Sequence, residues 1–201
     1  IEQNKLKRDS LFMEGALTAL SVVLNIDPKE INSETILNPG EGQHLLVNQI
    51  ENASESSLPA LYMFGMNLGE FIFTKPVRKR IQQRDLLESL YRRIHSLDPT
   101  YDFGSPIRLL GILYSRLPGM DMNQAKVYFD TAIRMYPNCF SHRTAKAEYY
   151  FIKSGNRESF HNELSQVMTL DPTKIPDIMP ENLMEQGRAE ILLKQELDLF
   201  E

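Results

Sequence analysis

Apolar positions recur three or four residues apart through most of the chain, which is the spacing of one face of an α-helix. The first such pattern covers residues 8–26, where Asp9 or Ser10 could cap a helix and Pro28 follows its end. Its stripe consists of small and large apolar residues: Leu11, Phe12, Gly15, Ala16, Ala19, Leu20, Val23 and Leu24. We expect a helix there with one buried face.

The pattern changes after this helix. Residues 27–43 are rich in Pro, Gly, Asn and Ser and are expected to form a loop with a short turn. Helices are then predicted over residues 44–53 and 57–73, the second with Ser57 as cap. No region has the sustained alternation of a strand, so we expect antiparallel helices joined by short loops, an all-α fold.

The second half of the chain repeats itself when its prolines Pro99, Pro137 and Pro172 are aligned. Positions twelve, eight and five residues before each proline are apolar: Leu87, Tyr91 and Ile94; Ala125, Phe129 and Ala132; Phe160, Leu164 and Val167. Upstream, Ile107, Leu110, Gly111 and Tyr114 match the first helix of a tetratricopeptide (TPR) repeat, with weaker copies around Gly65 and Ala147. Small residues let two helices cross closely, so the repeat predicts hairpins stacked as an α-solenoid with a closing helix.

A solenoid of this kind would line a concave groove with its first helices. Counting from the small residues Gly65, Gly111 and Ala147 places nine side chains in that groove: Tyr62, Met66, Arg108, Ile112, Ser115, Arg116, Thr144, Glu148 and Phe151. An arginine there could bind a carboxylate with two hydrogen bonds. The competing interpretation is that Met66, Ile112 and Phe151 only pack against neighbouring helices.

Charge and candidate chemistry narrow the function. The net charge of −5 argues against nucleic acid as the main partner. The basic run Lys75–Arg84 is interpreted as a solvated helix start or linker rather than a phosphate-binding patch, because no aromatic or Gly-rich element accompanies it. The four histidines are scattered, and no nucleotide-binding or hydrolase motif is found. Cys139 and His142 could share a helix face, but chance spacing is favoured because no orienting group is identified. We therefore expect no catalytic residue, no metal site and no cofactor.

The chain from Leu58 to Phe200 resembles the TatT component family, TPR proteins associated with tripartite ATP-independent periplasmic (TRAP) transporters. The matching segments include "YDFGSPIRLLGILYSRLPG", "QAKVYFDTAIRMYP" and "ENLMEQGRAEILLKQELDLF". The chain departs from the family at "PGMDMNQ", where only Gly119 of a Gly-Gly turn is present. Residues 1–57 match less clearly, and we expect a single helical domain over residues 1–201.

The resemblance implies a non-catalytic periplasmic scaffold that binds a TRAP substrate-binding protein and passes on an apolar or amphipathic ligand. It also implies a homo-oligomer, a trimer in some members, and a lipid anchor before residue 1. No apolar run approaches the about 18 residues of a membrane span, so a membrane would be reached only through that anchor. The alternative function is a soluble TPR adaptor that reads a partner's peptide in its groove.

Overall fold

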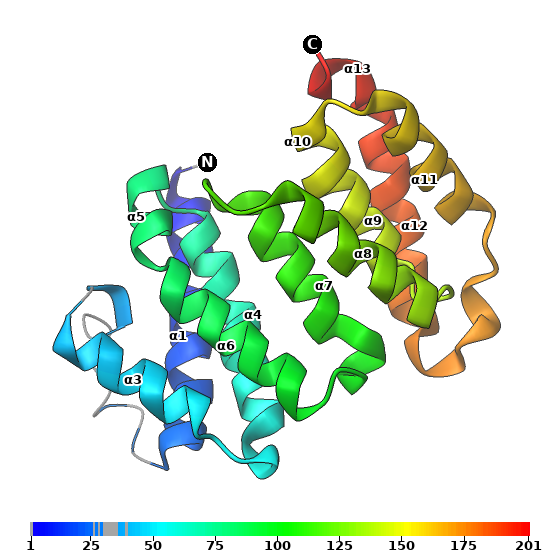
Figure 1. The fold of residues 1–201 in the computed structure, drawn as a ribbon. Helices are drawn as coiled ribbons and strands as arrows, with labels where there is room; N and C mark the ends of the chain where they lie inside the picture. Colours follow the sequence, from blue (N-terminus) through cyan, green and yellow to red (C-terminus); the bar gives the residue numbers. More distant parts are fainter. Residues whose placement is uncertain (1, 26, 28, 30–35, 39) are drawn as a thin grey trace. The chain divides into compact units, whose positions relative to one another are not determined.

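The computed structural model describes residues 2–25, 27, 29, 36–38 and 40–201, and every secondary-structure element described there is helical (Figure 1). The all-α prediction is therefore confirmed. Residues 28, 30–35 and 39 of the predicted loop over residues 27–43 lie outside the described residues.

The chain divides into two compact units, Ile1–Pro99 and Thr100–Glu201, which are described separately. Unit 1 contains α1 (Glu2–Leu24), α3 (Glu41–Glu51), η2 (Glu55–Ser57), α4 (Leu58–Phe73), α5 (Val77–Gln82) and α6 (Arg84–Leu97). Unit 2 contains α7 (Tyr101–Arg116), α8 (Met122–Met135), α9 (Ser141–Ala145), η3 (Lys146–Phe151), α10 (Ile152–Ser154), α11 (Arg157–Thr169), η4 (Pro172–Lys174), η5 (Pro176–Ile178), α12 (Met179–Lys194) and α13 (Glu196–Leu199).

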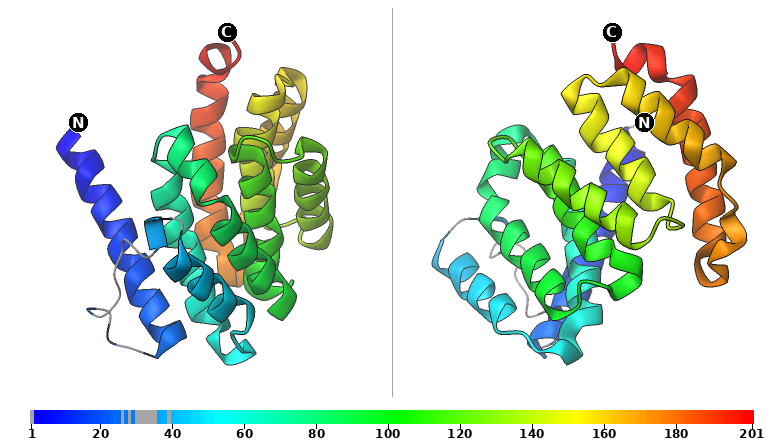
Figure 2. Two further views of the ribbon diagram at one scale, coloured as in Figure 1. Left: turned by 60° about the vertical axis from the view of Figure 1, so that its left-hand side comes forward. Right: turned by 45° about the vertical axis from the view of Figure 1, so that its right-hand side comes forward.

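In unit 1, α1 lies antiparallel to α4, and α6 packs against α3 and α4 (Figures 1 and 2). Helix α1 begins seven residues before the predicted caps Asp9 and Ser10. Asp9 lies inside the helix, where its carboxylate accepts hydrogen bonds from Lys75 Nζ at 2.7 Å and Thr74 Oγ1 at 3.0 Å. The Lys75 hydrogen bond lowers the pKa of Asp9 below its usual value. The residue therefore joins two helices rather than starting one.

The helix crossings follow the predicted small positions. A Cβ added to Gly111 on α7 would lie 3.0 Å from three ring atoms of Phe129 on α8. In unit 1, a Cβ on Gly65 would lie 3.0 Å from the ring of Tyr91, whose hydroxyl donates to the Gly65 carbonyl at 3.1 Å. The same small-against-aromatic pairing thus occurs in α7–α8 and in α4–α6. All nine aligned apolar positions before the prolines are buried.

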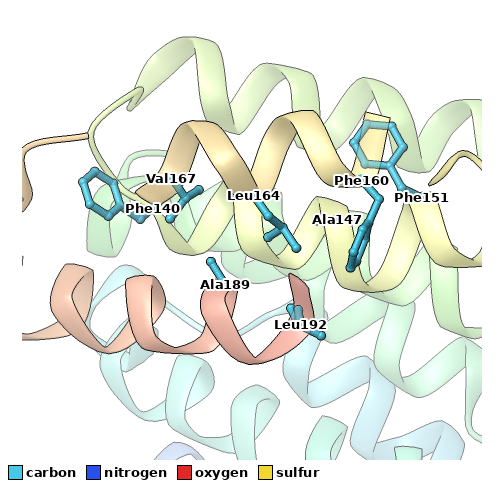
Figure 3. Packing of buried hydrophobic residues seen from close by; sticks show 8 residues of the cluster. All are labelled: Phe140, Ala147, Phe151, Phe160, Leu164, Val167, Ala189 and Leu192. Atoms are coloured by element: carbon cyan, nitrogen blue, oxygen red, sulfur yellow. The ribbon is translucent and has the colours of Figure 1, made fainter. Parts of the chain in front are cut away.

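The core of the last part of unit 2 lies between η3, α11 and α12 (Figure 3). Ala147, Leu164 and Ala189 are fully buried there, so small residues on η3 and α12 face the large residues of α11. The cluster is completed by Phe140, Phe151, Phe160, Val167 and Leu192.

Two irregular segments interrupt the helices of unit 2. Asp102, Phe103 and Gly104 are left-handed, with φ of 46°, 54° and 77°, which turns the chain before Pro106 and the rest of α7. Gly104 is required because a Cβ there would lie 2.9 Å from the Tyr136 ring. The second irregularity is η3, one π-helical segment within the continuous helical run from Ser141 to Ser154.

Candidate binding face

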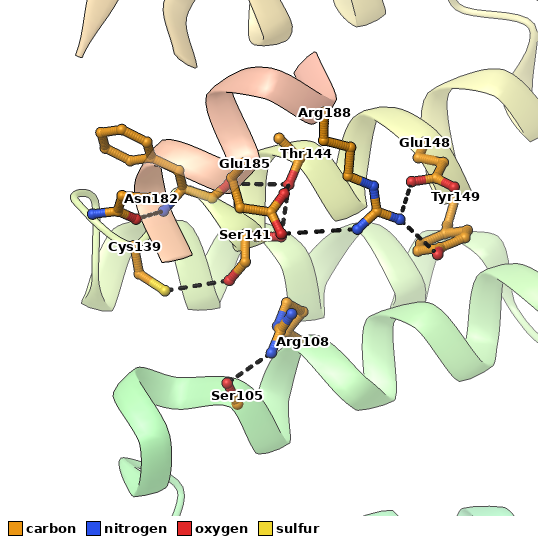
Figure 4. A network of polar contacts seen from close by, with 11 residues as sticks. Ser105, Arg108, Cys139, Ser141, Thr144, Glu148, Tyr149, Asn182, Glu185 and Arg188 are labelled. Atoms are coloured by element: carbon orange, nitrogen blue, oxygen red, sulfur yellow. Dashed lines mark hydrogen bonds and ion pairs between the residues drawn. The ribbon is translucent and has the colours of Figure 1, made fainter. Parts of the chain in front are cut away.

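The predicted groove residues of unit 2 lie on α7 and on the α9–η3 helix, and several of them take part in one polar network (Figure 4). Thr144 Oγ1 donates a hydrogen bond to the Glu185 carboxylate on α12. Glu148 accepts from Arg188, whose guanidinium also donates to the Tyr149 hydroxyl at 3.0 Å. The network therefore joins α9 and η3 to α12.

Tyr149 extends this network to α7. Its ring lies against two guanidinium groups, with Arg116 Cζ 5.0 Å and Arg188 Cζ 6.0 Å from the ring centroid. Both distances fit a cation–π contact. Burial alone would lower the pKa of Arg188, but the nearby Glu148 carboxylate raises it. The pKa of Arg188 is raised overall, so the guanidinium keeps its charge. Three helices of unit 2 thus contribute charged side chains to one face.

Asn182 fixes α12 against the start of α9. It is buried, accepts a hydrogen bond from the Phe140 amide at 3.0 Å and donates one to the Asn138 carbonyl at 2.9 Å. Asn138 precedes α9 and Phe140 is its N-cap residue. Backbone amides at a helix N-terminus lack partners within the helix. Asn182 therefore determines where Glu185 and Arg188, one and two turns further along α12, meet Thr144 and Glu148.

A cavity of about 140 Å³ adjoins the network beside Arg108. Arg108 Nη2 donates to Ser105 Oγ at 2.8 Å, while its Nε is buried and has no hydrogen-bond partner among the described residues. No carboxylate of the described residues lies within ion-pair distance of Arg108. Acidic side chains occupy other parts of the wall, so the cavity suits a ligand that brings an acceptor to Arg108 and donors elsewhere. Its lining comprises Asp102, Phe103, Ser105, Arg108, Cys139, Ser141, Ile178, Glu181, Asn182 and Glu185.

His142 supports the wall of this cavity through its contact with Phe103. Its ring is buried, and Nε2 lies 2.8 Å from the Phe103 carbonyl in the left-handed turn. Burial, with a further contribution from Arg108, lowers the pKa of His142 to about 3, so the ring is neutral near pH 7. Burial raises the pKa of Cys139, whose Sγ contacts Ser141 Oγ at 3.3 Å. Neither shift favours the thiolate–imidazolium pair of a cysteine nucleophile.

The other predicted residues of unit 2 are placed less favourably for ligand contact. Ile112 is half-buried. Ser115 is fully buried, and its carbonyl accepts from Lys153 Nζ at 2.6 Å. Phe151 belongs to the apolar core, at the end of the π segment that interrupts the 3.6-residue period on which its prediction depended. For Phe151 the structure agrees with the packing interpretation.

In unit 1 the predicted pair Tyr62 and Met66 does not line the open apolar surface. Tyr62 is buried and Met66 is half-buried. The surface between α1 and α4 instead forms a groove of about 680 Å³ to which Met63 contributes. Sequence reasoning missed it because the periodicity of α1 does not specify which helix it pairs with. The groove is lined by Leu11, Glu14, Gly15, Thr18, Ala19, Val22, Pro59, Ala60, Met63 and Asn67.

The described part of the chain contains neither a candidate metal site nor a membrane-spanning helix. No group of three or more His, Cys, Asp or Glu side chains could hold a metal ion there. None of the helices described is both long enough and apolar enough to cross a bilayer.

Two comparisons with known proteins bear on this arrangement. The family model of the TRAP transporter T-component matches residues 3–200. A comparison with curated proteins gave no match. The resemblance inferred from the sequence is thereby confirmed, and it extends over the N-terminal residues that had matched less clearly.

Proposed function

The chain belongs to the TRAP transporter T-component family, and on that premise we propose that it is a non-catalytic periplasmic scaffold that binds the substrate-binding protein of its transporter. The family points to a role in TRAP transport and is a transporter component rather than a class of enzymes. The observation that carries the proposal is the match over residues 3–200, which includes both units.

A TPR-type arrangement of the helices is part of this proposal. Its support is the repeated crossing of a small residue against an aromatic ring, Gly65 with Tyr91 and Gly111 with Phe129. The first helix of each pair then carries the binding side chains on its other face, as TPR proteins do. In unit 2 the side chains proposed for this role are Arg108 and Arg116 on α7 and Glu148 on η3.

The network makes this face suitable for a protein partner. Arg116, Glu148 and Arg188 are half-buried, and each already has a partner within unit 2. Their side chains are therefore held in place before binding, which reduces the entropy lost on association. Arginine and tyrosine are also enriched among the residues that contribute most to protein interfaces.

The proposal includes the passing on of an apolar or amphipathic ligand, and each unit offers a candidate site for it. The α1–α4 groove of unit 1 offers Leu11, Val22 and Met63 in a volume typical of small-molecule sites. The smaller cavity of unit 2 offers the Arg108 guanidinium to a carboxylate.

Titration calorimetry with the substrate-binding protein of the same transporter tests the proposal. We expect specific association, and we expect Arg116→Gln to weaken it by about tenfold or more, as loss of an interface arginine commonly does. Arg134→Gln is the matched control, since Arg134 is an exposed arginine on α8 whose guanidinium donates to Thr131 Oγ1 of the same helix.

One outcome counts against this function, and a second counts against the proposed contact face. A reproducible lack of association would remove the scaffold proposal. Association that Arg116→Gln and Arg134→Gln leave equally strong would keep the partner but place its contact outside the polar face of unit 2.

A further inference from the structure

Two basic segments that are about seventy residues apart in the sequence lie together at one end of unit 1. The first is the beginning of α1, with Lys5, Lys7 and Arg8. The second is formed by α5 and the first residue of α6, and it carries Arg78, Lys79 and Arg84. The ion pair between Asp9 and Lys75 joins the segments, because Asp9 follows the first and Lys75 directly precedes Pro76 and α5. Figures 1 and 2 show both at the same end of the unit.

These six exposed side chains, here named the basic end, carry little compensating charge. Arg78 and Lys79 form no ion pair with the described residues. Asp9 and Glu88 contact Arg8 and Arg84 only at 3.4 Å and 3.8 Å, and each carboxylate has a closer partner in Lys75 or Arg92. Asp85 is the remaining exposed acid on the adjoining turn of α6. The basic end is thus locally positive in a chain whose net charge is −5.

Aliphatic side chains stand exposed among these charges. Leu6 is 67% exposed, Val77 46% and Ile81 48%. Exposed lysine and arginine interspersed with aliphatic residues fit a lipid surface, where the charges meet acidic headgroups and the aliphatic groups enter the interfacial layer. A single-stranded nucleic acid would instead be held by aromatic side chains, which the segment from Lys75 to Arg84 lacks.

We propose that the basic end, with Leu6, Val77 and Ile81, docks unit 1 on a membrane surface that carries acidic phospholipids. The contact is peripheral and reversible, since it depends on headgroup attraction and three aliphatic side chains. It uses neither the polar face of unit 2 nor the α1–α4 groove, and it is independent of the function proposed above.

Vesicle co-sedimentation of the intact chain tests this proposal. Vesicles of phosphatidylcholine mixed with phosphatidylglycerol are compared with vesicles of phosphatidylcholine alone. We expect binding to the acidic vesicles only, weakening strongly between low salt and about 0.15 M salt. The double variant Arg78→Gln/Lys79→Gln should bind about 30-fold more weakly, from the attraction of each basic residue to an anionic surface.

Two further variants make the result specific. Val77→Ser/Ile81→Ser keeps the charge and should also weaken binding, because the interfacial contact of the side chains is lost. Arg134→Gln/Lys174→Gln removes the same charge from exposed positions of unit 2 and should leave binding unchanged. All variants alter exposed side chains, and equal thermal unfolding by circular dichroism verifies their folds.

Several outcomes would overturn the proposal. One is that the parent chain does not bind acidic vesicles. Another is that the Arg78→Gln/Lys79→Gln variant binds them as strongly as the parent chain. A third is that the Arg134→Gln/Lys174→Gln control loses as much vesicle binding as the Arg78→Gln/Lys79→Gln variant. Binding to a soluble polyanion such as heparin without binding to acidic vesicles would also overturn it, and would assign the basic end to an acidic macromolecule.

Discussion

At the scale of single residues, the polar groups of unit 2 differ in what burial does to them. Arg188 is held by Glu148 and Tyr149 and stays charged, whereas His142 is buried without a carboxylate partner and stays neutral. His142 instead contacts the Phe103 carbonyl and thereby supports the left-handed turn. Its observed contact is a structural hydrogen bond, and its lowered pKa does not favour the imidazolium that would stabilise a Cys139 thiolate.

A pH prediction follows from His142. The folded pKa of about 3 lies below the usual value of 6.5, so below pH 6.5 the unfolded chain takes up a proton that the folded chain does not. This residue's contribution to stability is therefore complete above pH 6.5 and is lost as the pH falls toward 3, by up to about 1.4 kcal/mol per pH unit. NMR of the folded protein should show a His142 ring that does not titrate between about pH 7 and pH 5.

The unfolded chain in urea is the control for that measurement, since its imidazoles should titrate near 6.5. Titration of His142 in the folded chain near that value would contradict the prediction.

At the scale of elements, the packing of helix pairs explains the regular small residues. Gly111 is close to the Phe129 ring because α7 and α8 cross there, and Gly65 meets Tyr91 for the same reason. Gly187 on α12 is a useful contrast, since nothing lies within 4 Å of a Cβ placed on it. All three glycines are helical, but only Gly65 and Gly111 lie at a helix crossing.

The pair Gly111→Leu and Gly187→Leu tests this account. We expect Gly111→Leu to lower the free energy of unfolding by about 1–3 kcal/mol or more, because the leucine must displace the Phe129 ring. We expect Gly187→Leu to leave stability equal or raise it by up to about 1 kcal/mol, because leucine is the better helix former. Urea unfolding followed by circular dichroism measures both, and a Gly111→Leu variant as stable as the parent would show that the helix crossing is misplaced.

At the scale of the whole molecule, each unit exposes apolar side chains that a folded chain usually covers. Val22 on α1 and Met63 on α4 are more than half exposed in unit 1, and Leu183, Met184 and Ile191 are more than half exposed on α12 of unit 2. Large apolar side chains exposed on one helix or along one groove are typical of association sites. It is consistent with the homo-oligomer that the family resemblance implies.

Multi-angle light scattering tests that assembly. A trimer should give a mass of about three times 23.2 kDa, and we expect Ile191→Glu to reduce it if α12 takes part. Val127→Glu is the matched control, because Val127 is similarly exposed on α8. A monomeric mass for the parent chain would contradict the trimer.

The sequence alone determined the helices and their close crossings, because both depend on short-range spacing. Residues twelve, eight and five before each proline are buried as that spacing predicts, whereas Phe151, predicted for the groove, lies in the core. The sequence did not identify Glu185 and Arg188 as partners of the predicted groove residues, since α12 meets α9 only after folding. Nor could it combine the basic run Lys75–Arg84 with Lys5, Lys7 and Arg8. Only tertiary structure brings these distant segments together, because helical periodicity fixes which face is apolar but not which helix covers it.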